Sequence, residues 1–205
     1  MNKEEMQLVL QDVRKAYRLL ADYQQRIIEL LDFIRNELKA EHYYHYQPNS
    51  IASQSIHKIY NAPDIGWKFL PMLNMNLLWH KTANVPAGEW WGDHIQQNDL
   101  VFDFCIVSDE DNDETLLPKE SKSELHIYVY KCVKYTRKNN WYADVWWKSE
   151  YPDFGEVKTL SNNKDTEYLV YGDKLDLSDL YDEEAVRKEL SEFRKRASEK
   201  LGQEI

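Results

Sequence analysis

The sequence predicts an α+β fold, with a long N-terminal helix, a central antiparallel β-sheet of about five to six strands, and a C-terminal helix. Residues 3–40 carry a sustained helical repeat of apolar residues. Residues 100–171 instead hold short apolar runs that are separated by turn-forming residues, the pattern of an antiparallel sheet. The chain has 205 residues, 42% of them hydrophobic, which is enough for one core of ordinary size.

The first predicted element is one helix over residues 3–40, which starts at a capping pair of Asn2 and Glu5. Its apolar residues alternate in spacings of three and four: Met6, Val9, Val13, Ala16, Leu20, Tyr23, Ile27, Leu30 and Ile34. This heptad repeat favours a homo-oligomer that forms through residues 6–34. A second apolar stripe (Leu10, Tyr17, Leu31, Leu38) widens the face and equally favours packing on the chain's own sheet.

A domain over residues 41–205 is expected to follow the helix at residues 1–40. Residues 41–66 are read as a polar and aromatic joint, residues 67–80 as one or two strands, and residues 100–107 as a strand. The central element is a β-hairpin over residues 123–148, in which two apolar runs flank the basic turn TRKNN. Its first run is apolar on both faces, which predicts an interior strand. Strands at 156–160 and 167–171 and a helix at 182–201, capped by Asp182, complete the prediction.

The composition of the chain limits the functions and partners that we expect for it. The formal net charge is −10, so the chain repels phosphate, and a basic protein is the expected partner. No run of about 18 apolar residues exists, and the start MNKEEMQLVLQD lacks an export signal, so we expect a cytoplasmic protein without a membrane partner. The sequence predicts no cofactor and no metal site, and its two cysteines are expected to be free thiols.

The leading hypothesis is a non-enzymatic interaction protein, such as a regulator, inhibitor or immunity-like protein. Trp90 and Trp91 lie with Asp93 and His94 in a loop between glycines, and tryptophan is enriched where proteins bind each other. We expect the contact to include the acidic segment 108–120. Within that segment, we expect the carboxylates of Asp109, Asp111 and Asp113 to contact the partner.

The same acidic segment also matches several positions of an EF-hand calcium loop. Asp109, Asp111 and Asp113 would fill positions 1, 3 and 5. Position 6, where that loop needs glycine for its turn, is Glu114. We therefore read residues 108–120 as a solvated acidic loop.

A second hypothesis assigns the chain to nucleic-acid chemistry. The segment RNELKAEH, from Arg35 to His42, resembles the R-x(4–6)-H motif of HEPN-type ribonucleases over eight residues. The resemblance implies that Arg35 stabilises phosphate charge while His42 moves a proton, in a site formed across a helical dimer. Those domains are all-helical, whereas most of this chain is predicted as strand.

The nucleic-acid hypothesis also has a binding form. Lys134, Arg137, Lys138 and Trp141 surround the turn of the predicted hairpin at 134–148. Mixed cations and aromatic rings bind single-stranded nucleic acid. A third hypothesis, a small-molecule pocket lined by aromatic residues, rests on the seven tryptophans and fourteen tyrosines.

Overall fold

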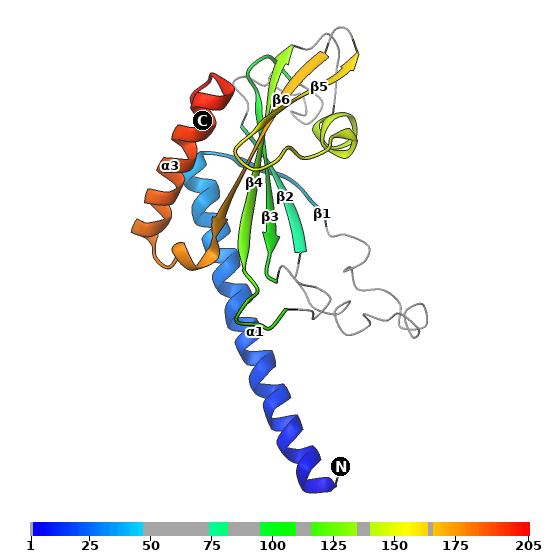
Figure 1. Ribbon diagram of the computed structural model, residues 1–205, viewed down its shortest axis with the longest axis vertical. Helices are drawn as coiled ribbons and strands as arrows, with labels where there is room; N and C mark the ends of the chain where they lie inside the picture. The colour runs from blue at the N-terminus through cyan, green and yellow to red at the C-terminus, as the bar shows by residue number, and fades with distance from the viewer. Residues whose placement is uncertain (1, 47–73, 82–94, 110–115, 135–139, 164–165) are drawn as a thin grey trace. The chain divides into compact units, whose positions relative to one another are not determined.

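The computed structural model describes residues 2–46, 74–81, 95–109, 116–134, 140–163 and 166–205. The chain divides into two compact units, Met1–Leu38 and Lys39–Ile205. The first unit is a single helix. The second contains a six-stranded antiparallel sheet and the C-terminal helix, so the α+β prediction is confirmed (Figure 1).

Helix α1 (Lys3–Leu38) begins at the predicted capping pair. The backbone N–H of Glu5 donates to Oδ1 of Asn2 at 2.9 Å, and the N–H of Asn2 donates to Oε2 of Glu5 at 2.7 Å. These reciprocal bonds satisfy donors that a helix start leaves open. The helix ends where Lys39 takes a positive φ of 53°, the left-handed conformation that commonly stops a helix.

The sheet is built from six strands in the order β1-β2-β3-β4-β6-β5, and every neighbouring pair is antiparallel. Their bounds are β1 (Glu41–Tyr46), β2 (Asn74–Lys81), β3 (Leu100–Val107), β4 (Glu124–Lys134), β5 (Val157–Asn163) and β6 (Thr166–Asp176). The prediction that the first run of the hairpin is an interior strand is confirmed, because β4 pairs with β3 on one side and with β6 on the other.

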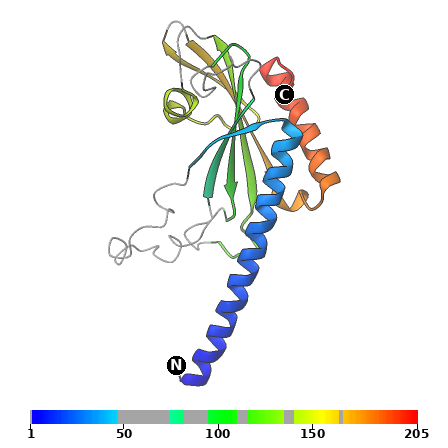
Figure 2. The same cartoon turned by 180° about the vertical axis from the view of Figure 1, so that it is seen from behind.

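Helix α3 (Glu183–Leu201) covers one face of the sheet, beside β6 (Figure 2). It begins as predicted, since Oδ1 of Asp182 accepts a hydrogen bond from the N–H of Ala185 at 2.8 Å. Gly202 ends it in the left-handed conformation, at a φ of 61°. One stripe of the helix is buried: Val186, Leu190, Phe193, Ala197 and Leu201.

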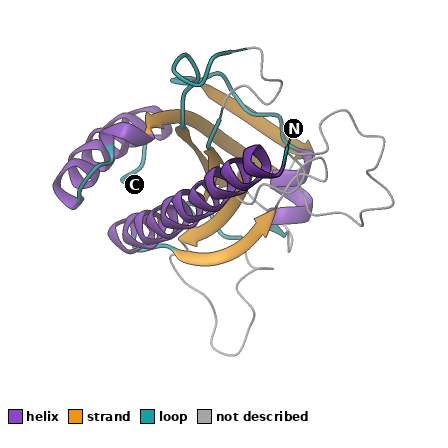
Figure 3. Ribbon diagram, turned by 90° about the horizontal axis from the view of Figure 1, so that it is seen from below, coloured by secondary structure: helices purple, strands orange, loops and turns teal. Residues whose placement is uncertain are grey.

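A short helical segment covers the opposite face, as Figure 3 shows from below. It consists of the π-helix η3 (Trp141–Val145) and the 3₁₀-helix η4 (Trp146–Lys148). Trp141 and Val145 enter a core that also contains Leu78, Tyr130 and Tyr168 of the sheet. Among the described residues, no helix has the length and apolar character needed to cross a membrane.

The predicted hairpin at residues 123–148 is therefore wrong in its second half, because residues 141–148 are helical. Asn140 provides the physical reason. Its Oδ1 accepts from the N–H of Ala143 at 3.0 Å, and its own N–H donates to Oδ2 of Asp144 at 3.0 Å. These local bonds start a helix and compete with a strand ladder. The prediction also missed β1, which was read as a joint.

Candidate interaction surface

Most of the residues predicted to bind a partner lie outside the described part of the chain. These are Trp90, Trp91, Asp93, His94, Asp111, Asp113, Arg137 and Lys138. Asp109 is described and is half-buried, and it accepts a hydrogen bond from Oγ of Ser121. The structure therefore places one end of the acidic segment and leaves the tryptophan loop as a prediction.

The basic hairpin at 134–148 does not exist as predicted. Lys134 is exposed at the end of β4, but Trp141 is only 1% exposed and belongs to the core. Its ring lies 5.6 Å from the ring of Tyr168. A buried indole cannot stack on a nucleic-acid base, so Trp141 is removed from the nucleic-acid hypothesis.

Arg35 and His42 belong to different units of the chain. Nη2 of Arg35 lies 2.6 Å from Oδ1 of Asp32, one helical turn earlier on α1. His42 lies in β1, where a bulge follows it, and its ring stacks 6.2 Å from the ring of His45. Among the described residues, no group of three His, Cys, Asp or Glu side chains is placed to hold a metal ion.

The structure reveals a different concentration of aromatic side chains, which we call the aromatic surface: Tyr44, Tyr142, Trp146, Trp147 and Tyr151. The rings of Tyr44 and Tyr142 are 4.2 Å apart. Tyr142 then lies 5.4 Å from Trp146 and 5.9 Å from Trp147. Trp147 is 58% exposed, Tyr151 43% and Tyr44 40%. Large rings thus remain open to solvent on this side of the sheet.

The winding of η3 explains how one short segment presents three rings together. The backbone N–H of Trp146 bonds to the carbonyl of Trp141, five residues earlier, as in a π-helix. This wide turn brings the residues that follow Tyr142 by four and five positions, Trp146 and Trp147, close to its ring. π-Helical turns are rare and are frequently found at functional sites.

A buried carboxylate, Asp103 of β3, fastens this surface to the sheet. Its Oδ2 accepts from the indole N–H of Trp146 and from the hydroxyl of Tyr151, both at 2.6 Å. Its Oδ1 accepts from the amide of Asn76 on β2 at 2.9 Å. Asn76 and Trp146 also donate to the hydroxyl of Tyr151, at 3.0 and 3.2 Å, so the four side chains form one closed network.

Burial raises the pKa of the Asp103 carboxyl above its ordinary value, and the hydrogen bonds from Tyr151, Asn76 and Trp146 act against that rise. All three donors are neutral side chains. They stabilise the carboxylate in a position where water is excluded. Asp103 therefore acts as an anchor that fixes η4 and the segment carrying Tyr151 relative to β2 and β3.

A second polar group continues along the same face of the sheet. Nε2 of His126 lies 2.9 Å from Oε2 of Glu124, and Nζ of Lys174 donates to Oε1 of Glu124 at 2.8 Å. Burial opposes ionisation of Glu124, but these two partners outweigh it and lower its pKa. The ring of Phe154 covers His126 at 4.8 Å.

Cys105 is the direct cross-strand neighbour of His126, and such a pair suggests a nucleophile with its base. Burial, followed by the nearby Asp103, raises the pKa of the Cys105 thiol to about 12. Nucleophilic catalysis needs the thiolate. Near neutral pH this sulfur is a protonated thiol, and the arrangement does not support a cysteine-dependent reaction.

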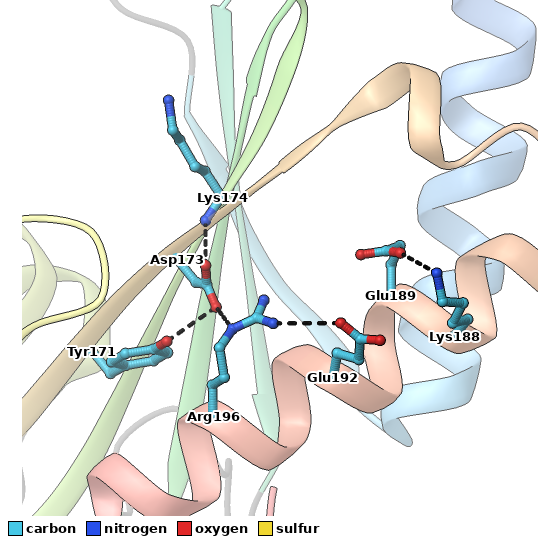
Figure 4. Close-up of polar contacts among 7 residues, drawn as sticks. All are labelled: Tyr171, Asp173, Lys174, Lys188, Glu189, Glu192 and Arg196. Atoms are coloured by element: carbon cyan, nitrogen blue, oxygen red, sulfur yellow. Dashed lines mark hydrogen bonds and ion pairs between the residues drawn. The ribbon is translucent and has the colours of Figure 1, made fainter.

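The contacts between α3 and β6 are structural (Figure 4). Oδ2 of Asp173 accepts from the hydroxyl of Tyr171 at 3.0 Å and from Nε of Arg196 at 2.9 Å. Arg196 comes from α3 and also pairs with Glu192 at 4.0 Å. This brace holds the helix on the face of the sheet that lies away from the aromatic surface.

The aromatic surface was missed by sequence reasoning because WYADVWWK alternates like a strand. Asn140 followed by Asp144, the residues that form the helix start, was the local signal against that interpretation. Nothing in the sequence distinguishes Asp103 from the other acidic residues of the chain. No pattern in the sequence pairs it with Trp146 or Tyr151.

The model of the family described as PM0109 matches residues 3–202 of this chain. An uncharacterized protein PM0109 of Pasteurella multocida (strain Pm70) is 56% identical over 206 residues, which cover the whole of both chains. No solved structure shows a significant match.

Proposed function

We propose that this chain, which belongs to the PM0109 family, is a non-enzymatic interaction protein that binds a basic protein partner through the aromatic surface. One observation carries the proposal: three large rings, Tyr44, Trp147 and Tyr151, remain at least 40% exposed on a rigidly held face of the sheet. Exposed aromatic clusters of this kind form the energetic centre of many protein–protein interfaces.

Rigidity of the surface supports the proposal. Binding costs less when side chains are already ordered, and Asp103 holds both Trp146 and Tyr151. Tyr151 is further fixed by stacking on Tyr128, whose ring is 3.9 Å away and inclined by 17°. Trp146 and Tyr151 are thus held in one geometry, which lowers the cost of binding a partner.

Charge near the surface supports a basic partner. Residues 140–156, which carry most of the rings, contain four carboxylates and one lysine. The lysine, Lys148, is paired with Asp144 at 3.0 Å. Asp153 and Glu156 are exposed. A cationic partner would meet an aromatic centre within an acidic rim, and the net charge of −10 would accelerate its approach.

The proposal is tested by capture on immobilised protein from nuclease-treated lysate, followed by titration calorimetry with the purified binder. We expect a basic protein that binds the wild type and binds the double variant Tyr44→Ala/Trp147→Ala at least about tenfold more weakly, since a central aromatic residue contributes about 2 kcal/mol.

Tyr181→Ala is the matched control, because Tyr181 is 74% exposed and lies before α3, outside the aromatic surface. It should bind as the wild type does. Equal affinity of the double variant and the wild type would refute the assignment of the surface. Retention of RNA from untreated lysate would instead favour the nucleic-acid hypothesis of Arg35 and His42, and a bound metabolite would favour a small-molecule site.

A further inference from the structure

We propose that α1 binds α1 of a second copy of this chain as an antiparallel two-helix coiled coil, through the seam from Met6 to Tyr23. This inference concerns α1 and is independent of the aromatic surface. It specifies the extent, direction and register of a self-association that the heptad repeat only suggests.

The exposed side chains of α1 define the extent of the seam. Met6, Val9 and Val13 are 40%, 48% and 42% exposed, and Leu10 and Tyr17 beside them are 47% and 69% exposed. From Ile27 onward, the seam residues Ile27, Leu30 and Ile34 are buried. Leu20 and Tyr23 are half-buried, and the exposed seam residues lie between Met6 and Ala16. The section that can accept a partner therefore runs from Met6 to Tyr23, and its apolar stripe requires cover.

The repeat favours another α1 as the occupant. Six seam residues keep the alternating spacing of three and four over this section: Met6, Val9, Val13, Ala16, Leu20 and Tyr23. That spacing is typical of helices that supercoil around each other, because the supercoil keeps the repeat facing the partner helix.

The direction follows from the residues that flank the seam. Each heptad has two seam residues, three positions apart. In a parallel pair, the residue just before the first of them faces the residue just after the second one in the partner helix. The latter positions are Leu10, Tyr17 and Gln24, all uncharged, so a parallel pair would form no flanking ion pair. In an antiparallel pair, each flanking position faces the same flanking position of the partner helix. Glu5 then lies opposite Arg26 of the second copy, and the two side chains can form an ion pair.

One antiparallel register matches the sizes of the facing seam residues and also pairs opposite charges at the flanking positions. Met6 then lies opposite Tyr23 of the second copy, Val9 opposite Leu20, and Val13 opposite Ala16. The two-fold symmetry repeats these three contacts, which gives six layers. At the centre, the smallest seam residue, Ala16, faces the β-branched Val13. Leu10 and Tyr17 of the two copies cover one side, and two Glu5–Arg26 pairs lie on the other. The overlap of residues 3–26 spans about 36 Å.

Val13→Asp tests the association in the full-length chain by sedimentation equilibrium. We expect the wild type to dimerise at micromolar concentration and the variant to dimerise at least about 100-fold more weakly, because two buried carboxylates would face the central layers. Gln11→Asp adds the same charge on the outer face and should dimerise like the wild type. Circular dichroism shows whether α1 remains helical. A wild type that stays monomeric would overturn the proposal.

Disulfide trapping tests the direction. A mixture of the single variants Met6→Cys and Tyr23→Cys should form a cross-linked heterodimer on mild oxidation, whereas Met6→Cys alone should not cross-link. Cross-linking of Met6→Cys to itself would overturn the antiparallel arrangement. The wild type sets the background, because burial raises the pKa of both native thiols, Cys105 and Cys132, to about 12 and slows their oxidation.

Discussion

Asp103 shows how a single buried side chain can determine a surface that it never reaches. The carboxylate is fully buried, yet it accepts hydrogen bonds from two side chains, Trp146 and Tyr151, that belong to the aromatic surface. A buried charge is costly unless donors surround it, and here the donors are the elements that need to be positioned. The hydrogen bonds that offset part of the cost of burial also fix η4 and Tyr151 in place.

Asp103→Ala is expected to lower the free energy of unfolding by about 3 kcal/mol, since it removes the common acceptor of three buried or partly buried donors. Urea denaturation measures the change, and near-ultraviolet circular dichroism reports the loosening of Trp146. Asp153→Ala, at an exposed carboxylate, should change stability by less than about 0.5 kcal/mol. A near-neutral effect of Asp103→Ala would show that the network does not anchor the surface.

His80 of β2 makes stability depend on pH. Its side chain is buried, and burial lowers its pKa despite Glu41, whose Oε2 lies 3.5 Å from Nε2 of His80. Below the ordinary histidine pKa of about 6.5, the unfolded chain therefore binds a proton that the folded chain still excludes. This contribution to stability is present above that pH and is lost as the pH falls through the lowered pKa.

His80→Gln should consequently lose less stability than the wild type between pH 7.5 and pH 5.5. Urea unfolding at several pH values measures this difference. His45→Gln, at an exposed histidine of β1, should retain the wild-type slope. If His80→Gln and the wild type lose stability in parallel, His80 is not the group responsible.

At the level of elements, the correct predictions were those that rest on a local pattern of residues. The strand at residues 100–107 and the helix after Asp182 were located correctly, because a short apolar run in one and a cap with an apolar stripe in the other are local signals. The capping pair of α1 was found for the same reason.

The elements that form the aromatic surface could not be predicted in this way. In residues 141–148, apolar and aromatic side chains alternate as in a strand, and the choice of helix depends on the cap at Asn140 and on burial of Trp141 and Val145 against the sheet. β1 was missed because five of its six residues, HYYHY, are aromatic or histidine and show no apolar alternation. The Asp103 network joins residues far apart in the sequence, and no local pattern encodes it.

At the scale of the whole molecule, the net charge of −10 acts over distances longer than any single contact. Such a charge attracts a basic partner before the surfaces touch, and salt screens the attraction with a Debye length of about 10 Å at 0.1 M. Charge and aromatic contact should therefore affect different steps of binding.

Raising sodium chloride from 0.05 to 0.5 M should reduce the association rate constant of the captured basic partner about tenfold or more, with little change in its dissociation rate. Surface plasmon resonance separates the two rates. Trp147→Ala should show the converse, a faster dissociation with an unchanged salt dependence of association. An association rate that does not respond to salt would argue against a basic partner.

Among the described strands, β2, β3 and β4 can each pair with the preceding one while the chain is being synthesised, but β6 is made last and enters between β4 and β5. Until Thr166–Asp176 has left the ribosome, the long apolar strand β4 keeps one hydrogen-bonding edge open. An open edge of this kind recruits strands from other chains. Pairing with β6 covers this edge, so translation of Thr166–Asp176 removes one site on β4 at which strands of other chains can pair.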